Sequence, residues 1–188
     1  MLIDRYRERL GPMLDGYEPK AIYHSELCNF CEEVFINFCT KIVESGTYLG
    51  YTAIRLAKVF PEIEIVTFEK DTERYRYAQG RCSPYPNITC LNAELTKHMD
   101  VITEKTAVLI DGPKGEAAIK LARKCRKKCT VVAIHDMRDY LDVLKRKFKN
   151  VWHTGGLREE YRALDEAIPY KPSHHEKGLY GKVLATVK

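Results

Sequence analysis

The feature that most constrains this chain is the stretch 42–55, Ile-Val-Glu-Ser-Gly-Thr-Tyr-Leu-Gly-Tyr-Thr-Ala-Ile-Arg. It reads as the end of a buried strand, a tight glycine turn and the start of a helix, which stops before Pro61. Gly46 and Gly50 permit a positive φ angle or a close approach of the backbone to a ligand. A loop of this kind aims backbone N–H groups at an anionic group, so the stretch predicts a ligand site.

Two carboxylates flank this loop in the expected sheet. Glu44 precedes the turn, and Glu69 follows the apolar stretch 63–68, at a distance that suits an acid bonding to a ribose. Tyr48 stands where a nicotinamide-binding G-x-G-x-x-G loop has its middle glycine, which argues against a pyrophosphate on the backbone. S-adenosylmethionine combines an ammonium for Glu44, a carboxylate for the loop and a ribose for Glu69. It is therefore the predicted ligand, with a ligand-free turn as the alternative.

The segment from Glu44 to Thr52 resembles the first motif of class I S-adenosylmethionine-dependent methyltransferases. The similarity covers residues 40–187 and is closest to the metal-dependent small-molecule O-methyltransferases of the catechol and caffeoyl-CoA type and their bacterial relatives. It implies a Rossmann-like, seven-stranded sheet whose last strand is antiparallel, preceded by a helical segment. It also implies a donor site formed by Glu44, Gly46, Thr47, Tyr48, Gly50, Thr52, Glu69, Lys70, Asn92, Ala93 and Asp111.

Apolar stretches alternate with amphipathic ones along the chain, which indicates an α/β fold with a doubly wound, mostly parallel sheet. Strands are predicted at 40–45, 63–68, 88–91, 106–110, 130–134, 151–153 and 179–187, and helices at 52–60, 72–81, 115–128 and 138–149. Asp71 is the expected cap of the second of these helices. Ligands of such sheets bind at the carboxyl ends of the strands. The residues expected there are Glu44, Glu69, Asn92, Asp111 and Asp136.

Length and composition predict a single methyltransferase domain over residues 1–188, with a helical cap at 1–39 and a Rossmann-like core at 40–188. No apolar stretch is long enough for a membrane span, and the polar start lacks a secretion signal. Seven cysteines without such a signal favour reduced thiols and a cytoplasmic location. Two groupings have the spacing of metal ligands, but their apolar neighbours favour buried thiols: His24, Cys28, Cys31 and Cys39, and Cys125 with Cys129.

Polar residues also end the fourth and fifth predicted strands. Asp111 and Lys114 match an Asp and a Lys of the metal-dependent enzymes, and Asp136 matches a second Asp, whereas Met137 replaces the expected Asn. The resemblance therefore implies Mg²⁺ held by Asp111 and Asp136. A divalent ion would lower the pKa of an acceptor hydroxyl, and Lys114, with a depressed pKa, would take its proton. His135 is the base expected if the enzyme uses no metal.

Other functions stay open at this point. Basic residues on the helices predicted at 115–128 and 138–149 allow an RNA or protein methyltransferase, although no aromatic residues interleave with them. A non-catalytic S-adenosylmethionine-binding module is a further alternative. The acceptor, expected to be a small molecule, would be bound by the segments 1–39 and 155–178. The first of these segments could also join a partner subunit, so a homodimer is a further expectation.

Overall fold

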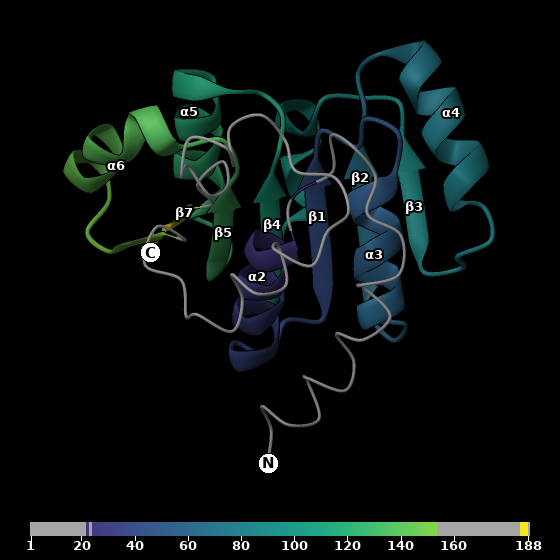
Figure 1. The fold of residues 1–188 in the computed structure, drawn as a ribbon, viewed down its shortest axis with the longest axis horizontal. Helices are drawn as coiled ribbons and strands as arrows, with labels where there is room; N and C mark the ends of the chain where they lie inside the picture. Colours follow the sequence, from purple (N-terminus) through teal and green to yellow (C-terminus); the bar gives the residue numbers. More distant parts are fainter. Residues whose placement is uncertain (1–21, 23, 154–184, 188) are drawn as a thin grey trace, which may run out of the picture.

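The computed structural model describes residue 22, residues 24–153 and residues 185–187 of the 188-residue chain. Its strands form one sheet in the order β3-β2-β1-β4-β5-β7-β6 (Figure 1). The strands are β1 (Lys41–Ser45), β2 (Glu64–Phe68), β3 (Ile88–Leu91), β4 (Thr106–Ile110), β5 (Val131–Ile134), β6 (Val151–His153) and β7 (Ala185–Val187). Strands β1 to β5 pair in parallel, and β7 pairs antiparallel with both β5 and β6. The predicted α/β, mostly parallel architecture is confirmed.

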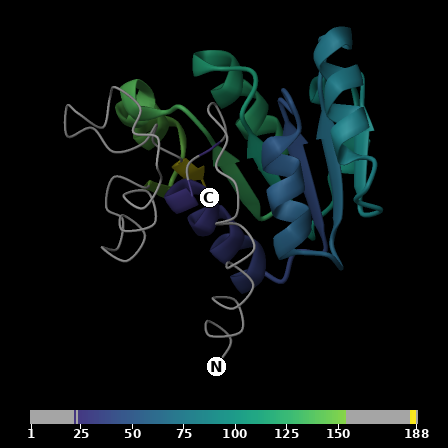
Figure 2. The same cartoon turned by 45° about the vertical axis from the view of Figure 1, so that its right-hand side comes forward.

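Helices pack on both faces of this sheet, as Figures 1 and 2 show. The helices are α2 (His24–Ile36), α3 (Tyr51–Val59), α4 (Thr72–Cys82), α5 (Gly115–Cys125) and α6 (Leu141–Lys147). Successive strand residues face opposite sides, so that Ile42 lies in one core with α2 and α3, and Val43 lies in the other with α5 and α6. This two-sided core is what makes the sheet doubly wound, and it leaves the carboxyl ends of β1, β2, β4 and β5 at one common edge.

Local signals in the sequence explain several element boundaries. Asp71 caps α4 as predicted, because its Oδ1 accepts the backbone N–H of Arg74 at 2.9 Å. The helix predicted at 115–128 ends earlier, at Cys125, where the chain tightens into a turn. The helix predicted at 138–149 is divided into a 3₁₀ turn (Arg138–Tyr140) and α6.

The cysteine pattern reflects the two cores. Cys28, Cys31 and Cys39 are buried on the α2 and α3 side, and Cys125 and Cys129 are buried on the opposite side. Among the described residues, these thiols join no cluster that could hold a metal ion, although the side chain of His24 lies outside the description.

None of the helices in the described part of the chain combines the length and apolar character that a membrane crossing needs. The predicted connection 155–178 and most of the segment before α2 also lie outside the described residues.

Candidate active site

The two glycines of the loop after β1 have the predicted backbone conformation. Gly46 has φ 97° and Gly50 has φ 84°. A Cβ atom at Gly46 would lie 2.6 Å from the backbone nitrogen of Gly112, and one at Gly50 would lie 2.9 Å from the Cys82 sulfur. Both glycines are therefore required by close packing within the protein, and their tight neighbours are the loop after β4 and helix α4.

Four backbone N–H groups of this loop have partners within the protein, and the expectation that the loop binds an anion stays a prediction. Gly46 and Thr47 both donate to the Phe68 carbonyl, at 2.9 and 3.1 Å. Tyr48 donates to Glu69 Oε2 at 2.9 Å, and Gly50 donates to the Thr47 carbonyl at 2.9 Å. The parallel pairing of β1 with β2 places the loop beside the end of β2, so the loop is hydrogen-bonded to that strand.

Glu69 occupies a fixed position at the end of β2. Its Oε2 accepts the Tyr48 N–H, and its Oε1 accepts the N–H of Asp71 at 3.0 Å. The Asn92 side chain donates to the Glu69 carbonyl at 2.8 Å, which braces the same turn. Each carboxylate oxygen has a second lone pair, so Glu69 remains able to accept hydrogen bonds from a ligand.

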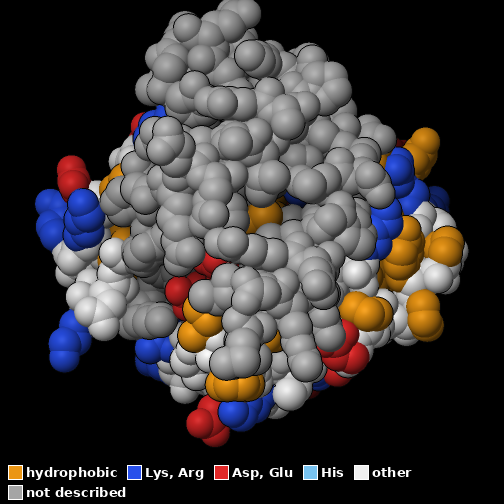
Figure 3. Space-filling view, turned by 60° about the horizontal axis from the view of Figure 1, so that its bottom comes forward, with side chains coloured by type: hydrophobic (Ala, Val, Ile, Leu, Met, Phe, Trp, Pro, Cys, Tyr) orange, Lys and Arg blue, Asp and Glu red, His pale blue; other side chains and the backbone are white. Residues whose placement is uncertain are grey.

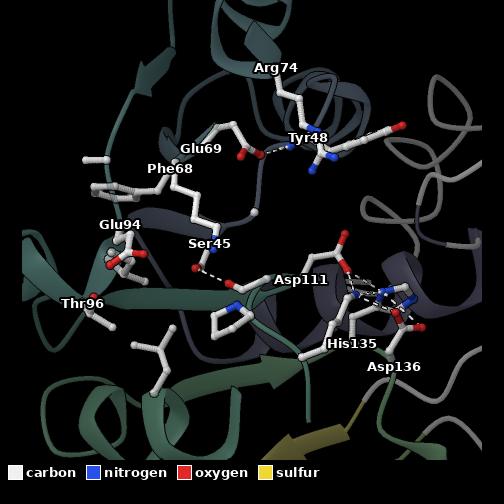
Figure 4. A pocket seen from close by; sticks show the side chains of 18 residues that line it. Ser45, Tyr48, Phe68, Glu69, Arg74, Glu94, Thr96, Asp111, His135 and Asp136 are labelled. Carbon is white, nitrogen blue, oxygen red and sulfur yellow. Dashed lines mark hydrogen bonds and ion pairs between the residues drawn. The ribbon is translucent and has the colours of Figure 1, made fainter. Parts of the chain in front are cut away.

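A pocket of about 570 Å³ opens along this edge of the sheet (Figure 4). Nine of its lining residues were predicted as site residues: Gly46, Tyr48, Glu69, Lys70, Ala93, Asp111, Lys114, His135 and Asp136. The sequence analysis missed the others, which are Ser45, Phe68, Arg74, Glu94, Leu95, Thr96, Gly112, Pro113 and Leu121. Most of these directly follow or precede predicted residues, so proximity to the strand ends was the available signal. In Figure 4 the Glu69 side chain lies above Ser45, and the side chains of Asp111, His135 and Asp136 lie to its right.

Five predicted donor residues do not line the pocket: Glu44, Thr47, Gly50, Thr52 and Asn92. Glu44 is fully buried, and its Oε2 accepts the Thr67 hydroxyl at 2.6 Å. Thr67 in turn lies 2.5 Å from the Thr47 hydroxyl. Burial raises the pKa of Glu44 to about 8, with the Thr67 hydrogen bond acting in the opposite direction. Glu44 is therefore linked through Thr67 to Thr47 of the loop, and its expected contact with the ammonium of a ligand stays a prediction.

At the other end of the pocket, four predicted residues converge in one charged cluster. Lys114 Nζ lies 2.5 Å from Asp111 Oδ1 and 2.6 Å from Asp136 Oδ2. His135 Nδ1 lies 2.6 Å from the same Asp111 oxygen. Asp136, the second residue after β5, has φ 62°, a left-handed conformation that is uncommon outside glycine.

Glu26 of helix α2 completes this cluster, and the sequence analysis did not identify it. Its side chain is 1% exposed, and its Oε2 lies 3.1 Å from His135 Nε2. The ring of His135 is thus held between two carboxylates from α2 and from the end of β4. Its place next to the apolar residues Leu27, Cys28 and Phe30 was the signal that could have pointed to it.

These contacts shift the pKa values of both predicted bases upward. Burial lowers the pKa of His135, but the carboxylates of Glu26 and Asp111 outweigh it and raise the value to about 10. Burial likewise opposes the charge of Lys114, yet Asp111 and Asp136 raise its pKa above the ordinary value. Burial acts to raise the pKa of Asp111, and the cations His135 and Lys114 reverse this and hold it well below its usual range. These contacts favour the protonated forms of both residues, and the roles expected for Lys114 and His135 as bases stay predictions.

The same geometry bears on the expected Mg²⁺. Asp111, His135 and Asp136 each offer a ligand atom, and these atoms lie within 4.8 Å of one another. However, both ring nitrogens of His135 face carboxylates, and the Lys114 ammonium lies between the two aspartates. Met137 is fully buried in the core on the α5 side. As arranged, these residues do not fit a divalent ion, so Mg²⁺ at Asp111 and Asp136 stays a prediction and no catalytic step is assigned to it.

Neither a protein-family model nor a curated protein sequence matches this chain. Solved structures do match its fold. The O-methyltransferase TomG from Streptomyces achromogenes, in complex with SAM, has a TM-score of 0.60 at 14% identity, over 97% of this chain and 89% of that chain. The SAM-dependent O-methyltransferase from Thermotoga maritima has a TM-score of 0.61 at 12% identity, over 96% and 71%. The O-methyltransferase from Bacillus cereus, in complex with SAH, has a TM-score of 0.54 at 17% identity, over 100% and 90%.

These similarities establish a common architecture. The chain has the fold of S-adenosylmethionine-dependent O-methyltransferases. The resemblance based on the segment from Glu44 to Thr52 is thereby confirmed at the level of the fold.

Proposed function

We propose that this chain is an S-adenosylmethionine-dependent methyltransferase that acts on an oxygen of a small molecule. The observation that carries the proposal is one continuous pocket with a fixed acid, Glu69, at one end and the Asp111–Lys114–Asp136 cluster at the other. Two structures with this fold were solved with SAM or SAH, which supports the same ligand for this chain. A cytoplasmic location, a homodimer and a single domain remain predictions from the sequence.

The end of the pocket at β2 fits an adenosine. Glu69 has lone pairs available for the ribose hydroxyls, and its two backbone hydrogen bonds fix its direction. Phe68 and Leu95 give this end apolar surface for a base, and Ala93 lies beside them in the pocket lining. When bound, S-adenosylmethionine supplies an electrophilic methyl group on a sulfonium. The chain's own residues have to hold the acceptor oxygen in line with that group, and such positioning can supply a large part of the rate enhancement.

The proposal is tested with radiolabelled S-adenosylmethionine and a panel of phenols, carboxylic acids and alcohols. Methylated product is expected with the wild type. Glu69→Ala is expected to weaken donor binding at least about tenfold, because a hydrogen bond to a charged group contributes about 1.5–3 kcal/mol. Glu73→Ala, an exposed acid in the first turn of α4, is the matched control and should bind as the wild type does. Equal binding by the wild type and Glu69→Ala would refute the assignment of the pocket.

A second candidate is methyl transfer to RNA, and a separate observation favours it. The exposed sides of α5 and α6 and the turns after them carry basic residues: Lys120, Arg123, Lys124, Lys127, Lys128, Lys145, Arg146, Lys147 and Lys149. Lys and Arg side chains are visible at the left-hand edge of Figure 3, the side on which Figure 1 places α6. Salt-sensitive RNA binding that disappears when Lys145, Arg146 and Lys147 become Glu would support this candidate.

A non-catalytic module that only binds the donor is the remaining alternative. It predicts donor binding that Glu69→Ala abolishes, together with no transfer to any small-molecule, RNA or protein acceptor. The charged cluster at the end of β4 and β5 argues against it, because donor binding alone does not require buried Glu26 and His135 beside the pocket.

A further inference from the structure

The position of the Lys114 ammonium is the observation from which this inference starts. It lies between two carboxylates from different strand ends, 2.5 Å from Asp111 Oδ1 and 2.6 Å from Asp136 Oδ2. These are short, charge-assisted contacts. The Lys114 side chain is nevertheless 49% exposed, and it lines the pocket together with both aspartates. The ammonium is therefore both fixed by the protein and accessible to a molecule in the pocket.

The rest of the cluster surrounds Asp111 with further charged or polar side chains. His135 Nδ1 lies 2.6 Å from Asp111 Oδ1, and its Nε2 lies 3.1 Å from Glu26 Oε2, so both ring nitrogens face carboxylates. His135 Nδ1 is also 3.5 Å from Lys114 Nζ, which is a much longer contact than those of Lys114 with the two aspartates. Three carboxylates thus surround Lys114 and His135 within one connected network.

We propose that Lys114 is the built-in cation of the acceptor site, taking the place between Asp111 and Asp136 that a divalent metal ion would otherwise occupy. Its role toward the acceptor rests on the proposed methyltransferase function, whereas its position between the aspartates does not. The burial of Met137 in the core agrees with this arrangement, because no amide oxygen is presented there as a third metal ligand.

The arrangement also defines the class of acceptor. An ammonium has three N–H donors, and two are used by Asp111 and Asp136. The described residues offer no acceptor for the third, which is available to an oxygen in the pocket. A fixed ammonium favours an acceptor oxygen that carries negative charge, such as that of an acidic phenol, an enol or a carboxylate. Its lone pair forms the new C–O bond, the methyl carbon–sulfur bond breaks toward the sulfonium sulfur, and the charges cancel without a proton transfer.

The experiment is a titration of purified, chelator-treated protein with Mn²⁺ alone, followed by electron paramagnetic resonance of free Mn²⁺. The wild type should bind Mn²⁺ weakly. Lys114→Met leaves two carboxylates without their cation and is expected to bind Mn²⁺ at least about tenfold more tightly. Lys114→Arg keeps the charge and serves as the matched control, which should resemble the wild type. The double variant Lys114→Met with Asp136→Asn should lose the new site.

Three results would overturn the proposal. They are wild-type Mn²⁺ binding as tight as that of Lys114→Met, no gain in Lys114→Met, and tight binding that survives Asp136→Asn. Lys114→Gln repeats the test if the methionine variant does not show a cooperative thermal transition. No S-adenosylmethionine is present in this titration, so its outcome is independent of the proposed function. If the wild type binds S-adenosylmethionine and also binds Mn²⁺ tightly, only the proposal of a built-in cation is refuted, and the proposed function stands.

Discussion

Replacing Glu26 by Gln tests the buried part of the charged cluster. The change keeps the size of the side chain but removes the carboxylate that lies 3.1 Å from His135 Nε2. Both side chains are nearly inaccessible, with 1% and 7% exposure, so solvent cannot replace the lost charge. Removing one partner of a buried ion pair typically costs about 3–5 kcal/mol. The free energy of unfolding at pH 7 should therefore fall by about 3 kcal/mol, which lowers the Tm by about 6–12 °C for a chain of this length.

The pH dependence distinguishes a charge effect from a packing effect. The pKa of His135 is raised to about 10 in the folded protein, above the value near 6.5 expected when unfolded. Its stabilising contribution is thus complete below about pH 6.5 and is lost as the pH rises through about 10. Above that pH the His135 ring is neutral in the wild type and in Glu26→Gln, so the difference in free energy of unfolding between them should shrink.

Urea unfolding at pH 7 and at pH 10.5 measures both effects. Glu104→Gln, at an exposed acid in the loop before β4, is the control and should stay within about 0.5 kcal/mol of the wild type. Equal stability of Glu26→Gln and wild type at pH 7 would show that the pair does not stabilise the fold. A deficit of the same size at both pH values would show that packing, and not charge, is responsible.

Three further predictions concern the loop, a helix cap and the acceptor. Gly46→Ala should destabilise the protein by more than about 2 kcal/mol, because φ is 97° and the new Cβ would lie 2.6 Å from the Gly112 nitrogen. Thermal unfolding measures this loss, and an unchanged Tm would contradict it. Asp71→Ala removes the cap to the Arg74 N–H and should cost about 1 kcal/mol in urea unfolding, whereas no loss would show that the cap is unimportant. If Lys114 is the built-in cation, a chelator should leave methyl transfer unchanged, and acidic phenols should be methylated in preference to aliphatic alcohols. A product assay in which aliphatic alcohols are methylated in preference to phenols would argue against this role of Lys114.

The fold and the place of the site could be predicted because their signals are local. Apolar stretches of strand length, a glycine turn after the first of them, and polar residues at strand ends were sufficient to place Glu69, Asp111 and Asp136 at one edge of a parallel sheet. The positive φ angles at Gly46 and Gly50 agree with the sequence analysis, in which these glycines permit a positive φ or a close approach of the backbone.

The features that the sequence analysis did not foresee depend on contacts between segments that are distant in the sequence. Glu26 and His135 are 109 residues apart, and nothing local shows that α2 brings that acid against the end of β5. The contact of Lys114 with Asp136 was not foreseen because this carboxylate partner comes from another strand end. The acceptor of the Gly46 and Thr47 N–H groups, the Phe68 carbonyl, was not foreseen because it becomes adjacent only through the register of β1 with β2.

The most direct test of the central claim is a calorimetric titration of the wild type with S-adenosylmethionine, with and without Mg²⁺. The arrangement of the pocket predicts micromolar binding that is the same in both conditions and is lost in Glu69→Ala. No binding in either condition would contradict the assignment and leave only the fold shared with the O-methyltransferases.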